Sequence, residues 1–270
     1  MIELSLLYMA GGRSSRFGGE PKFLAKIGKD NETLFEYSVN QIRKHIKINH
    51  VHIIVNKDNN IDILNEAKRI KCKYDLLFEI TSNIQEIPEY RSKPWGTGEA
   101  ASSAWEYMKR PFLLLNSDDL YDEKTFEQID RECDTNKNYI IGFELGKTLK
   151  NNNKANRAFI HSEDNQVLHL KEQLNIERMT YTEDELKRII VSVNLFLLQP
   201  SVLMNMVNIS DKFKLNYKDN NLLEALLPDF INDIIRNGKM KLNIVTSSGE
   251  WNGITFKNDI EKIKKDLDIL

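Results

Sequence analysis

The chain has 270 residues, 41% hydrophobic and 29% charged, a composition typical of a globular protein with a sizeable core. Its 38 basic and 40 acidic residues leave a formal net charge of −2, which excludes a nucleic-acid binder that depends on a basic surface. No apolar stretch approaches the roughly 18–20 residues of a membrane span, and Ile2–Ala10 lacks the flanks of a signal peptide. Because Cys72 and Cys133 are too few and too far apart for a disulfide framework, we expect a cytoplasmic protein.

Apolar runs and helical periodicity alternate through the first half of the chain. Strands are predicted at Leu4–Met9, Val51–Val55, Leu76–Ile80 and Phe112–Leu115, and helices at Thr33–His45, Ile61–Ile70 and Ala100–Met108. This alternation predicts an α/β fold with a Rossmann-like, mixed but mostly parallel sheet and helices on both faces. The loops after Met9, Ile80 and Leu115 would open at the carboxyl edge of the sheet, where such folds bind ligands.

The second half is less regular and richer in strands. A hairpin is predicted from Ala158–His161 and Val167–Leu170, further strands at Ile189–Leu198 and Leu242–Val245, and helices at Leu222–Asn237 and Asp259–Leu267. No linker composition or repeat divides the chain. We therefore expect one domain over residues 1–270, with β-rich insertions in its second half.

A glycine-rich segment, MAGGRSSRFGGEPK, follows the first predicted strand at residues 9–22. Small residues there let backbone amides approach an anion. Arg16 offers a fork for phosphate oxygens and Lys22 a movable positive charge. The spacing matches neither a P-loop nor a dinucleotide fingerprint, and an ordinary turn with two solvated basic residues explains it equally well.

Two adjacent carboxylates, Asp118 and Asp119, follow the predicted strand Phe112–Leu115. Mg²⁺ prefers carboxylate and phosphate oxygens together. Adjacent side chains in extended backbone face opposite ways, so only one of the two carboxylates can face a metal ion. The alternative for both is a helix N-cap or an Asx turn before Glu123–Cys133.

Six segments, in the correct order, resemble the signature segments of the sugar-nucleotide pyrophosphorylases (sugar-1-phosphate nucleotidylyltransferases). They are residues 9–22, 93–100 (KPWGTGEA), 115–121 (LNSDDLY), 167–172 (VLHLKE), 191–196 (VSVNLF) and 251–256 (WNGITF). The resemblance spans nearly the whole chain. It implies an enzyme that joins a nucleoside triphosphate, with UTP or dTTP favoured, to a sugar 1-phosphate, using Mg²⁺ and releasing pyrophosphate.

The resemblance also implies a role for individual residues. Arg16 and Lys22 would be catalytic, and Asp118 would hold the metal. The remaining assignments are Ala10, Gly11, Gly12, Gly96 and Thr97 for the nucleotide, and Glu172 and Asn194 for the sugar phosphate. Residues 1–135 would form the nucleotide-binding half, 136–256 the sugar-phosphate-binding half and 257–270 a C-terminal helix, whose apolar face leaves room for a homodimer.

Three departures from the family pattern concern the metal, the sugar phosphate and the first loop. Gly253 stands where many relatives have a metal-binding aspartate, with Asp259 as a distant substitute. Gln173 stands where a lysine often follows the sugar-contacting glutamate, so Lys171 and Arg178 are the candidate cations for the sugar phosphate. The compact first loop also resembles molybdenum-cofactor guanylyltransferases and related cytidylyltransferases.

Three other functions compete with sugar-nucleotide synthesis. The first is nucleotidyl transfer to a non-sugar acceptor, such as a pterin or polyol phosphate. A test of different acceptors would distinguish it from sugar-nucleotide synthesis. A glycosyltransferase would carry Asp-x-Asp at the metal loop, where this chain has Asp118-Asp119-Leu120. A non-catalytic sensor with the same fold would have no need of Arg16, Lys22 and Asp118 together.

Overall fold

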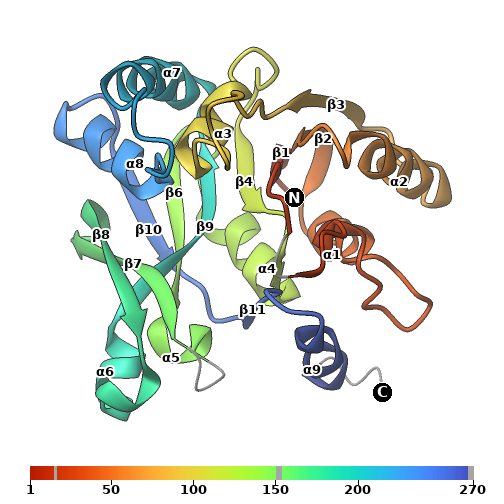
Figure 1. Ribbon diagram of the computed structural model, residues 1–270. Helices are drawn as coiled ribbons and strands as arrows, with labels where there is room; N and C mark the ends of the chain where they lie inside the picture. The colour runs from red at the N-terminus through yellow and green to blue at the C-terminus, as the bar shows by residue number, and fades with distance from the viewer. Residues whose placement is uncertain (15–16, 150–153, 267–270) are drawn as a thin grey trace.

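The molecule is built around one large β-sheet (Figure 1). A computed structural model describes residues 1–14, 17–149 and 154–266. The strands of this sheet are β1 (Glu3–Ala10), β2 (Lys47–Val55), β3 (Glu79–Ile84), β4 (Phe112–Asn116), β6 (Asn138–Glu144), β7 (Ala155–Glu163), β8 (Gln166–Ile176), β9 (Ile190–Leu198) and β10 (Leu242–Thr246). Within the described residues their spatial order is β3-β2-β1-β4-β9-β6-β10-β8-β7.

Parallel pairs dominate only the N-terminal side of this sheet. β1 pairs in parallel with β2 and β4, and β2 pairs in parallel with β3. β9 runs antiparallel between β4 and β6, and the hairpin β7–β8 closes the far edge. The prediction of a mixed α/β fold is confirmed, with parallel pairing concentrated in β1–β4 and in the pair β6–β10.

Helices cover both faces because successive side chains of a strand point to opposite sides. The helices are α1 (Leu34–Arg43), α2 (Asn60–Lys73), α3 (Thr97–Ser103), α4 (Glu123–Glu132), α5 (Leu145–Thr148), α6 (Glu183–Arg188), α7 (Pro200–Asn216), α8 (Leu227–Arg236) and α9 (Asn258–Asp266), with short 3₁₀ turns η2 (Lys22–Leu24) and η3 (Arg178–Thr180). From β1, Leu6 and Tyr8 enter one apolar cluster with α1, α2 and α4. Leu7 and Met9 enter another with α3, α7 and α8, the group at the upper left of Figure 1.

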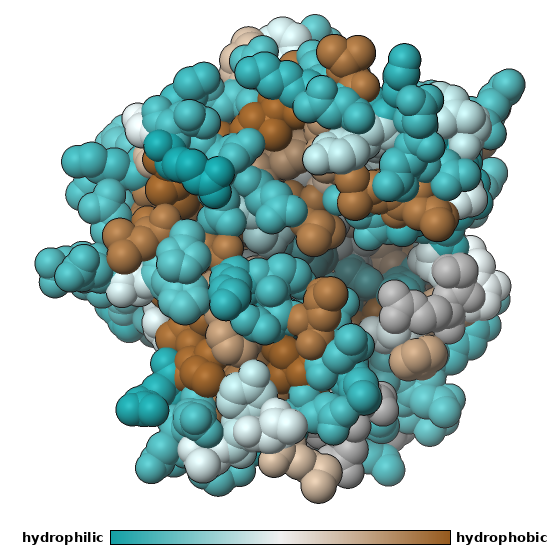
Figure 2. Space-filling model, turned by 60° about the vertical axis from the view of Figure 1, so that its left-hand side comes forward, coloured by the Kyte–Doolittle hydropathy of each residue, from teal (hydrophilic) through white to brown (hydrophobic). Residues whose placement is uncertain are grey.

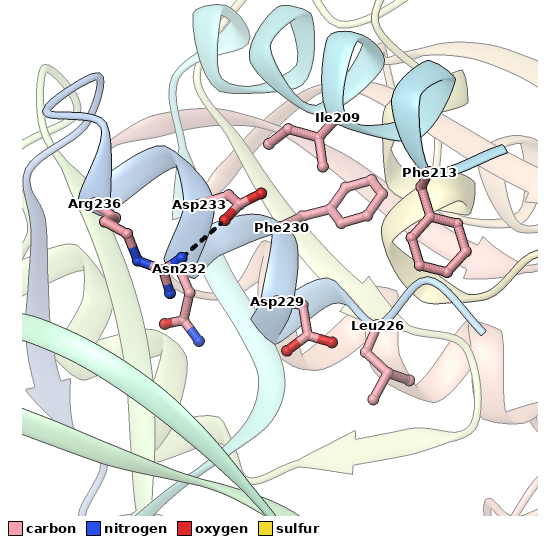
Figure 3. Close-up of a pocket in the computed structure, with 8 residues that line it drawn as sticks. All are labelled: Ile209, Phe213, Leu226, Asp229, Phe230, Asn232, Asp233 and Arg236. Atoms are coloured by element: carbon pink, nitrogen blue, oxygen red, sulfur yellow. Dashed lines mark hydrogen bonds and ion pairs between the residues drawn. The ribbon is translucent and has the colours of Figure 1, made fainter. Parts of the chain in front are cut away.

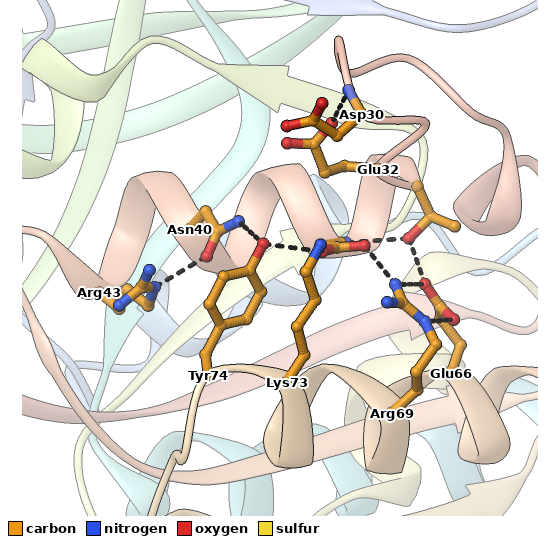
Figure 4. A network of polar contacts seen from close by, with 10 residues as sticks. Asp30, Glu32, Asn40, Arg43, Glu66, Arg69, Lys73 and Tyr74 are labelled. Carbon is orange, nitrogen blue, oxygen red and sulfur yellow. Dashed lines mark hydrogen bonds and ion pairs between the residues drawn. The ribbon is translucent and has the colours of Figure 1, made fainter.

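A buried carboxylate ties α2 to α1 (Figure 4). The side chain of Glu36, on α1, is 1% exposed and accepts hydrogen bonds from Lys73 Nζ and the Tyr74 hydroxyl, each at 2.7 Å. Arg69 completes the group as a second cation. A carboxylate at this depth is destabilising unless it is paired and hydrogen-bonded, so these contacts fix how the two helices dock.

The third predicted strand lies further along the chain than expected. Leu76 lies three residues after the end of α2 and Leu77 is 95% exposed, so the segment 76–78 does not form a strand. The strand is instead β3, whose half-buried residues pair with β2 along its whole length. The position of β3 could not be recognised in the sequence, because this strand has few large apolar residues.

Other helix and strand bounds also differ. The helix expected at Leu222–Asn237 begins only at Leu227, with Pro228 in its first turn, where the fixed φ of proline is accommodated. The helix expected at Ala100–Met108 is α3, which both begins and ends earlier. β6 and α7 had no counterpart among the predicted elements. β6 is buried along most of its length, whereas α7 buries only one face.

A small second sheet positions the C-terminal segment. β5 (Asp119–Tyr121) pairs antiparallel with β11 (Trp251–Gly253), and the register places Gly253 opposite Asp119. α9 follows β11 and lies beside it in Figure 1. This pairing brings segments about 130 residues apart in the chain to the carboxyl end of β4.

Candidate active site

A cleft of about 990 Å³ opens beside the carboxyl end of β4. Its walls come from the loop after β4, the strands β7, β8 and β9, the segment 251–256 and α9. Of the residues assigned by resemblance, Thr97, Asp118, Glu172 and Asn194 line it. Its volume lies at the upper end of the range of about 300–1,000 Å³ for small-molecule sites, so it is large enough for a nucleotide-sized ligand.

An ion pair links the first loop to the cleft. Lys22, in η2, donates a hydrogen bond from Nζ to Asp118 Oδ2 at 2.8 Å. The Lys22 side chain is 15% exposed and that of Asp118 39%, so the carboxylate is the more accessible partner. Arg16, the other residue predicted to be catalytic, lies outside the described residues. The structure thus joins Lys22 to Asp118, two residues that are 96 positions apart.

Asparagine side chains hold the backbone of the glycine loop. Asn59 Nδ2 donates to the carbonyl of Ala10, and Asn56 Nδ2 donates to the carbonyl of Gly12, both at 3.0 Å. These bonds orient the loop without using its amides, which an anion would require. Neither Ala10 nor Gly12 lines the cleft, although both are close in sequence to η2.

Gln85 joins the two glycine segments, and sequence reasoning did not single it out. Its Nε2 donates to the Gly96 carbonyl at 3.1 Å and to Glu99 Oε2 at 2.8 Å. A Cβ placed on Gly11 would lie 2.5 Å from Gln85 Oε1, which leaves no room there for a side chain. Gly11 and Gly96 therefore share one buried amide, although neither lines the cleft.

Gly96 itself needs to be glycine. Its φ is +123°, and a Cβ would approach the backbone of Ala225 within 2.6 Å. The neighbouring Thr97 accepts a hydrogen bond on Oγ1 from the amide of Leu227, which fixes the start of α8 against α3. The segment 96–97 is thus a close contact between α3 and the chain around residue 225.

Asp119 differs from Asp118 in its surroundings. Its carboxylate is buried and accepts hydrogen bonds from Asn116 Nδ2 at 2.8 Å and from the Tyr121 hydroxyl at 3.3 Å. Burial, followed by repulsion from Asp118, raises the pKa of Asp119. The helix-cap alternative is wrong for both residues, because Asp122 caps α4 by accepting from the Lys124 amide.

The position of Gly253 favours glycine in this chain. A Cβ there would lie 2.7 Å from the Trp251 ring and 3.2 Å from Asp119 Oδ1. Asp259 lines the cleft, but its carboxylate accepts hydrogen bonds from the Thr255 and Phe256 amides. Among the described residues no three His, Cys, Asp or Glu side chains cluster as a metal centre. The loop after β4 therefore supplies the accessible carboxylate, Asp118.

A bulge in β9 shapes the opposite wall. The register between β6 and β9 shifts between Ile140 and Gly142, and Asn194 there has a φ of +62°. Asparagine tolerates this left-handed conformation better than most residues, and the backbone amide of Asn194 donates a hydrogen bond to Ser192 Oγ at 3.1 Å. Irregular backbone of this kind re-aims side chains next to functional sites.

Glu172, on β8, is half-buried in the same wall. Burial raises the pKa of its carboxyl, repulsion from Asp229 adds to this effect, and the positive charge of Arg157 opposes it. The strand register places Glu172 opposite Ala158, next to Arg157. The place of Glu172 in the cleft is fixed by the hairpin β7–β8.

The two cations expected for the sugar phosphate lie elsewhere. Lys171 is exposed on β8, and Arg178 donates to the Gly146 carbonyl at 2.9 Å and pairs with Glu183 at 3.2 Å. Neither lines the cleft. Arg157, on β7, does line it, and its guanidinium lies over the Trp251 ring at 4.7 Å. An arginine in an alternating strand gives no sequence signal that would separate it from a solvated one.

A second pocket lies between α7 and α8 (Figure 3). It measures about 170 Å³ and is lined by Phe213, Phe230 and Asp229 among others. This volume is below that of typical ligand sites.

On the face in Figure 2, apolar side chains form separate patches between polar ones. Among the described residues no helix is long and apolar enough to cross a membrane.

The first part of the chain matches a known family. Residues 6–80, which contain β1, the glycine loop and β2, match the model of the MobA-like NTP transferase domain. The match makes this part of the chain similar to an NTP transferase domain. The prediction of a nucleotidyltransferase is thereby confirmed.

Solved structures of nucleotidyltransferases share the fold over the whole chain. The inositol-1-phosphate CTP transferase from T. maritima has a TM-score of 0.67 and 12% identity, over 98% of this chain and 96% of that one. A UDP-glucose pyrophosphorylase in complex with UDP-glucose has a TM-score of 0.66 and 13% identity, over 99% of both chains. CTP:phosphocholine cytidylyltransferase from Streptococcus pneumoniae has a TM-score of 0.62 and 12% identity, over 98% and 99%. No curated protein matches the sequence closely enough to count as a relative.

Proposed function

We propose that this nucleotidyltransferase joins a nucleoside triphosphate, UTP or dTTP, to a sugar 1-phosphate, giving a nucleotide sugar and pyrophosphate. The observation that carries the proposal is the pairing of Lys22 with Asp118 at a cleft whose other wall holds Glu172 and Asn194. In this proposal residues 1–135 bind the nucleotide, residues 136–256 bind the sugar phosphate, and residues 257–270 form the C-terminal segment. The likeness to a UDP-glucose pyrophosphorylase supports the choice of a uridine or thymidine nucleotide.

The reaction needs positioned charge more than a base. An oxygen of the acceptor phosphate attacks the α-phosphorus, the new phosphorus–oxygen bond forms, and the bond from the α-phosphorus to the bridging oxygen breaks. Pyrophosphate leaves with that electron pair. The nucleophile is already an anion, so no proton has to be removed from it. Lowering the barrier then depends on bringing anions together and stabilising the charge that moves onto the leaving group.

In this proposal the residues divide that work. Lys22 leaves Asp118 and stabilises the α-phosphate, and Arg16 holds the leaving phosphates. The amides of Gly11, Gly12 and Thr97 contact the nucleotide. At Gly12 no described atom lies within 4 Å of where a Cβ would stand, which leaves space for a ligand. Glu172 and Asn194 accept and donate hydrogen bonds to the sugar hydroxyls, which would satisfy a half-buried carboxylate and amide.

Asp118 is the residue that would hold Mg²⁺. One or two carboxylates together with substrate phosphates are the usual ligand set of this ion. An accessible carboxylate whose protein partner is a flexible lysine fits that requirement. When bound, Mg²⁺ supplies positive charge to the phosphate oxygens.

The proposal is tested by measuring pyrophosphate release with Mg²⁺, crossing the common nucleoside triphosphates with a panel of sugar 1-phosphates. We expect release that requires both one triphosphate and one sugar 1-phosphate. Release without any acceptor, or with free sugars as well as with their phosphates, would contradict it.

A non-sugar acceptor is the second candidate. The matched family model describes a MobA-like domain, and CTP:phosphocholine cytidylyltransferase has the same fold. Including choline phosphate, polyol phosphates and a pterin phosphate in the panel separates the two candidates. Release with one of these and with no sugar 1-phosphate would favour the second candidate.

A further inference from the structure

Arg157 lies in the wall of the cleft that the strands β7, β8 and β9 form. It is on β7, opposite Gln173 of β8, and its neighbours in the cleft are Glu172 and Asn194. Its guanidinium stacks over the Trp251 ring, 4.7 Å from the centroid. The strand and the ring together hold the cation in one place, on the side proposed above for the acceptor.

The hydrogen bonds of Arg157 are incomplete. Nη1 donates to the Asn156 carbonyl at 2.7 Å and Nη2 donates to the Thr148 carbonyl at 2.9 Å. A guanidinium has five N–H groups. Nε is fully buried and has no acceptor within the described part of the chain. Buried N–H groups are nearly always paired, so one without an acceptor points to a ligand that the protein itself does not supply.

The carboxylates near Arg157 do not take up its hydrogen-bond donors. Its neighbours Asp119 and Glu172 are both carboxylates. Burial lowers the pKa of the Arg157 guanidinium, and the charges of these two neighbours oppose that shift. Neither forms a hydrogen bond with it among the described residues. Without Arg157 this wall would present two carboxylates to an incoming phosphate. With Arg157 the wall has a fixed fork of N–H donors, which suits phosphate oxygens.

The other basic residues of the described lining are less suitable. Lys154 pairs with Glu177 at 2.7 Å and is largely exposed, and Lys262 and Lys265 belong to α9, on the other side of the cleft. Lys171 and Arg178 do not line the cleft at all. Arg157 is therefore the cation on β7–β9 that combines burial, a fixed position and free donors.

We propose that Arg157 binds the phosphate group of the acceptor. This inference rests on the proposed function and adds to it a residue that recognises the acceptor. The phosphate would be held by the guanidinium on one side while its oxygen faces the α-phosphorus. The same site would bind inorganic phosphate weakly, because the recognised chemistry is a phosphate and not the group attached to it.

The test uses Arg157→Gln and Arg157→Lys, with Lys171→Gln as the matched control that removes an exposed charge from the neighbouring strand. With the acceptor identified from the panel, Arg157→Gln should raise the KM of the acceptor by about 10–100-fold, as expected for losing a charged hydrogen bond. The KM of the nucleotide should stay within about two-fold, since the two substrates use different walls. Arg157→Lys should fall between wild type and Arg157→Gln, and Lys171→Gln should match wild type.

Several results would overturn the inference. Equal rises in KM for both substrates, or a lower melting temperature with unchanged KM values, would mean that Arg157 acts only by neutralising Asp119 and Glu172. If Arg157→Gln does not fold, an unchanged acceptor KM in Arg157→Lys would have the same meaning.

Binding of inorganic phosphate separates this inference from the proposed function. If wild type releases no pyrophosphate with any acceptor, the proposed function fails, and calorimetry with inorganic phosphate then tests Arg157 alone. Binding by wild type and by Lys171→Gln that is lost in Arg157→Gln and weakened in Arg157→Lys would support the site. Equal binding by all variants, or no binding by wild type, would overturn it.

Discussion

Replacing Lys22 in its ion pair with Asp118 should affect stability and turnover to different extents, so the two effects can be measured separately. In Lys22→Gln the pair, 2.8 Å long, is lost. At an effective dielectric constant of about 20, the attraction at this distance is about 6 kcal/mol before desolvation. Most of it is offset by removing Lys22 from water and by ordering its side chain. Because Asp118 is 39% exposed and is rehydrated in the variant, the net loss of stability should be about 1 kcal/mol.

Turnover should respond more strongly than stability. A preorganised charge at a transferring phosphoryl group contributes about 3–4 kcal/mol, so kcat/KM should fall by about 10²–10³. The melting temperature should fall by only about 2–4 °C. Differential scanning fluorimetry and pyrophosphate release measure the two effects, with Lys26→Gln as an exposed control in the same segment. A variant that keeps near-normal turnover, or that loses activity only in proportion to its folded fraction, would refute the assignment of Lys22.

Three further predictions concern separate parts of the molecule. Asn194→Gly, which keeps the left-handed backbone, should raise the KM of the sugar phosphate by about ten-fold and leave the KM of the nucleotide unchanged. Asn194→Ala should in addition lower the free energy of unfolding by about 1 kcal/mol, because alanine resists a φ of +62°. Glu36→Gln should lower the free energy of unfolding, measured in urea, by about 3 kcal/mol, because it breaks a buried ion pair. Both KM values should stay unchanged. A loss below about 0.5 kcal/mol would contradict the role of Glu36 in docking α2 against α1. Burial lowers the pKa of His52 to about 4. The neutral imidazole therefore stabilises the fold at and above pH ~6.5. This contribution of about 3 kcal/mol to the free energy of unfolding is lost as the pH falls from ~6.5 towards ~4. Urea unfolding of His52→Gln should show a flatter pH dependence over this range, and identical slopes for variant and wild type would exclude His52 as the cause.

The parallel side of the sheet could be predicted because its signals are local. β1, β2 and β4 are short runs of buried apolar residues followed by loops, and periodicity identifies such runs directly. β3 could not be placed correctly, because its residues are only half-buried, and the buried Phe78 just before it lies outside the strand. The fold of that segment is determined by pairing with β2, which depends on tertiary structure.

The candidate site divides in the same way. Asp118, Glu172 and Asn194 could be named from motif order, and all three line the cleft. Arg157 could not be found, because its place depends on the hairpin register and on a tryptophan 94 residues later in the chain. The left-handed backbone of Asn194 was equally hidden, since it arises from a bulge between two strands and not from the residues beside it.

The central claim is that the enzyme transfers the nucleotidyl group, which contains the α-phosphate, to an acceptor phosphate. The most direct test follows two labels in parallel reactions, one with the triphosphate labelled at the α-phosphate and one with it labelled at the γ-phosphate. We predict that the α label appears in a conjugate with the acceptor and the γ label in pyrophosphate. The γ label on the acceptor would indicate a kinase, and the γ label in free inorganic phosphate with no conjugate formed would indicate hydrolysis. Either result would contradict the account.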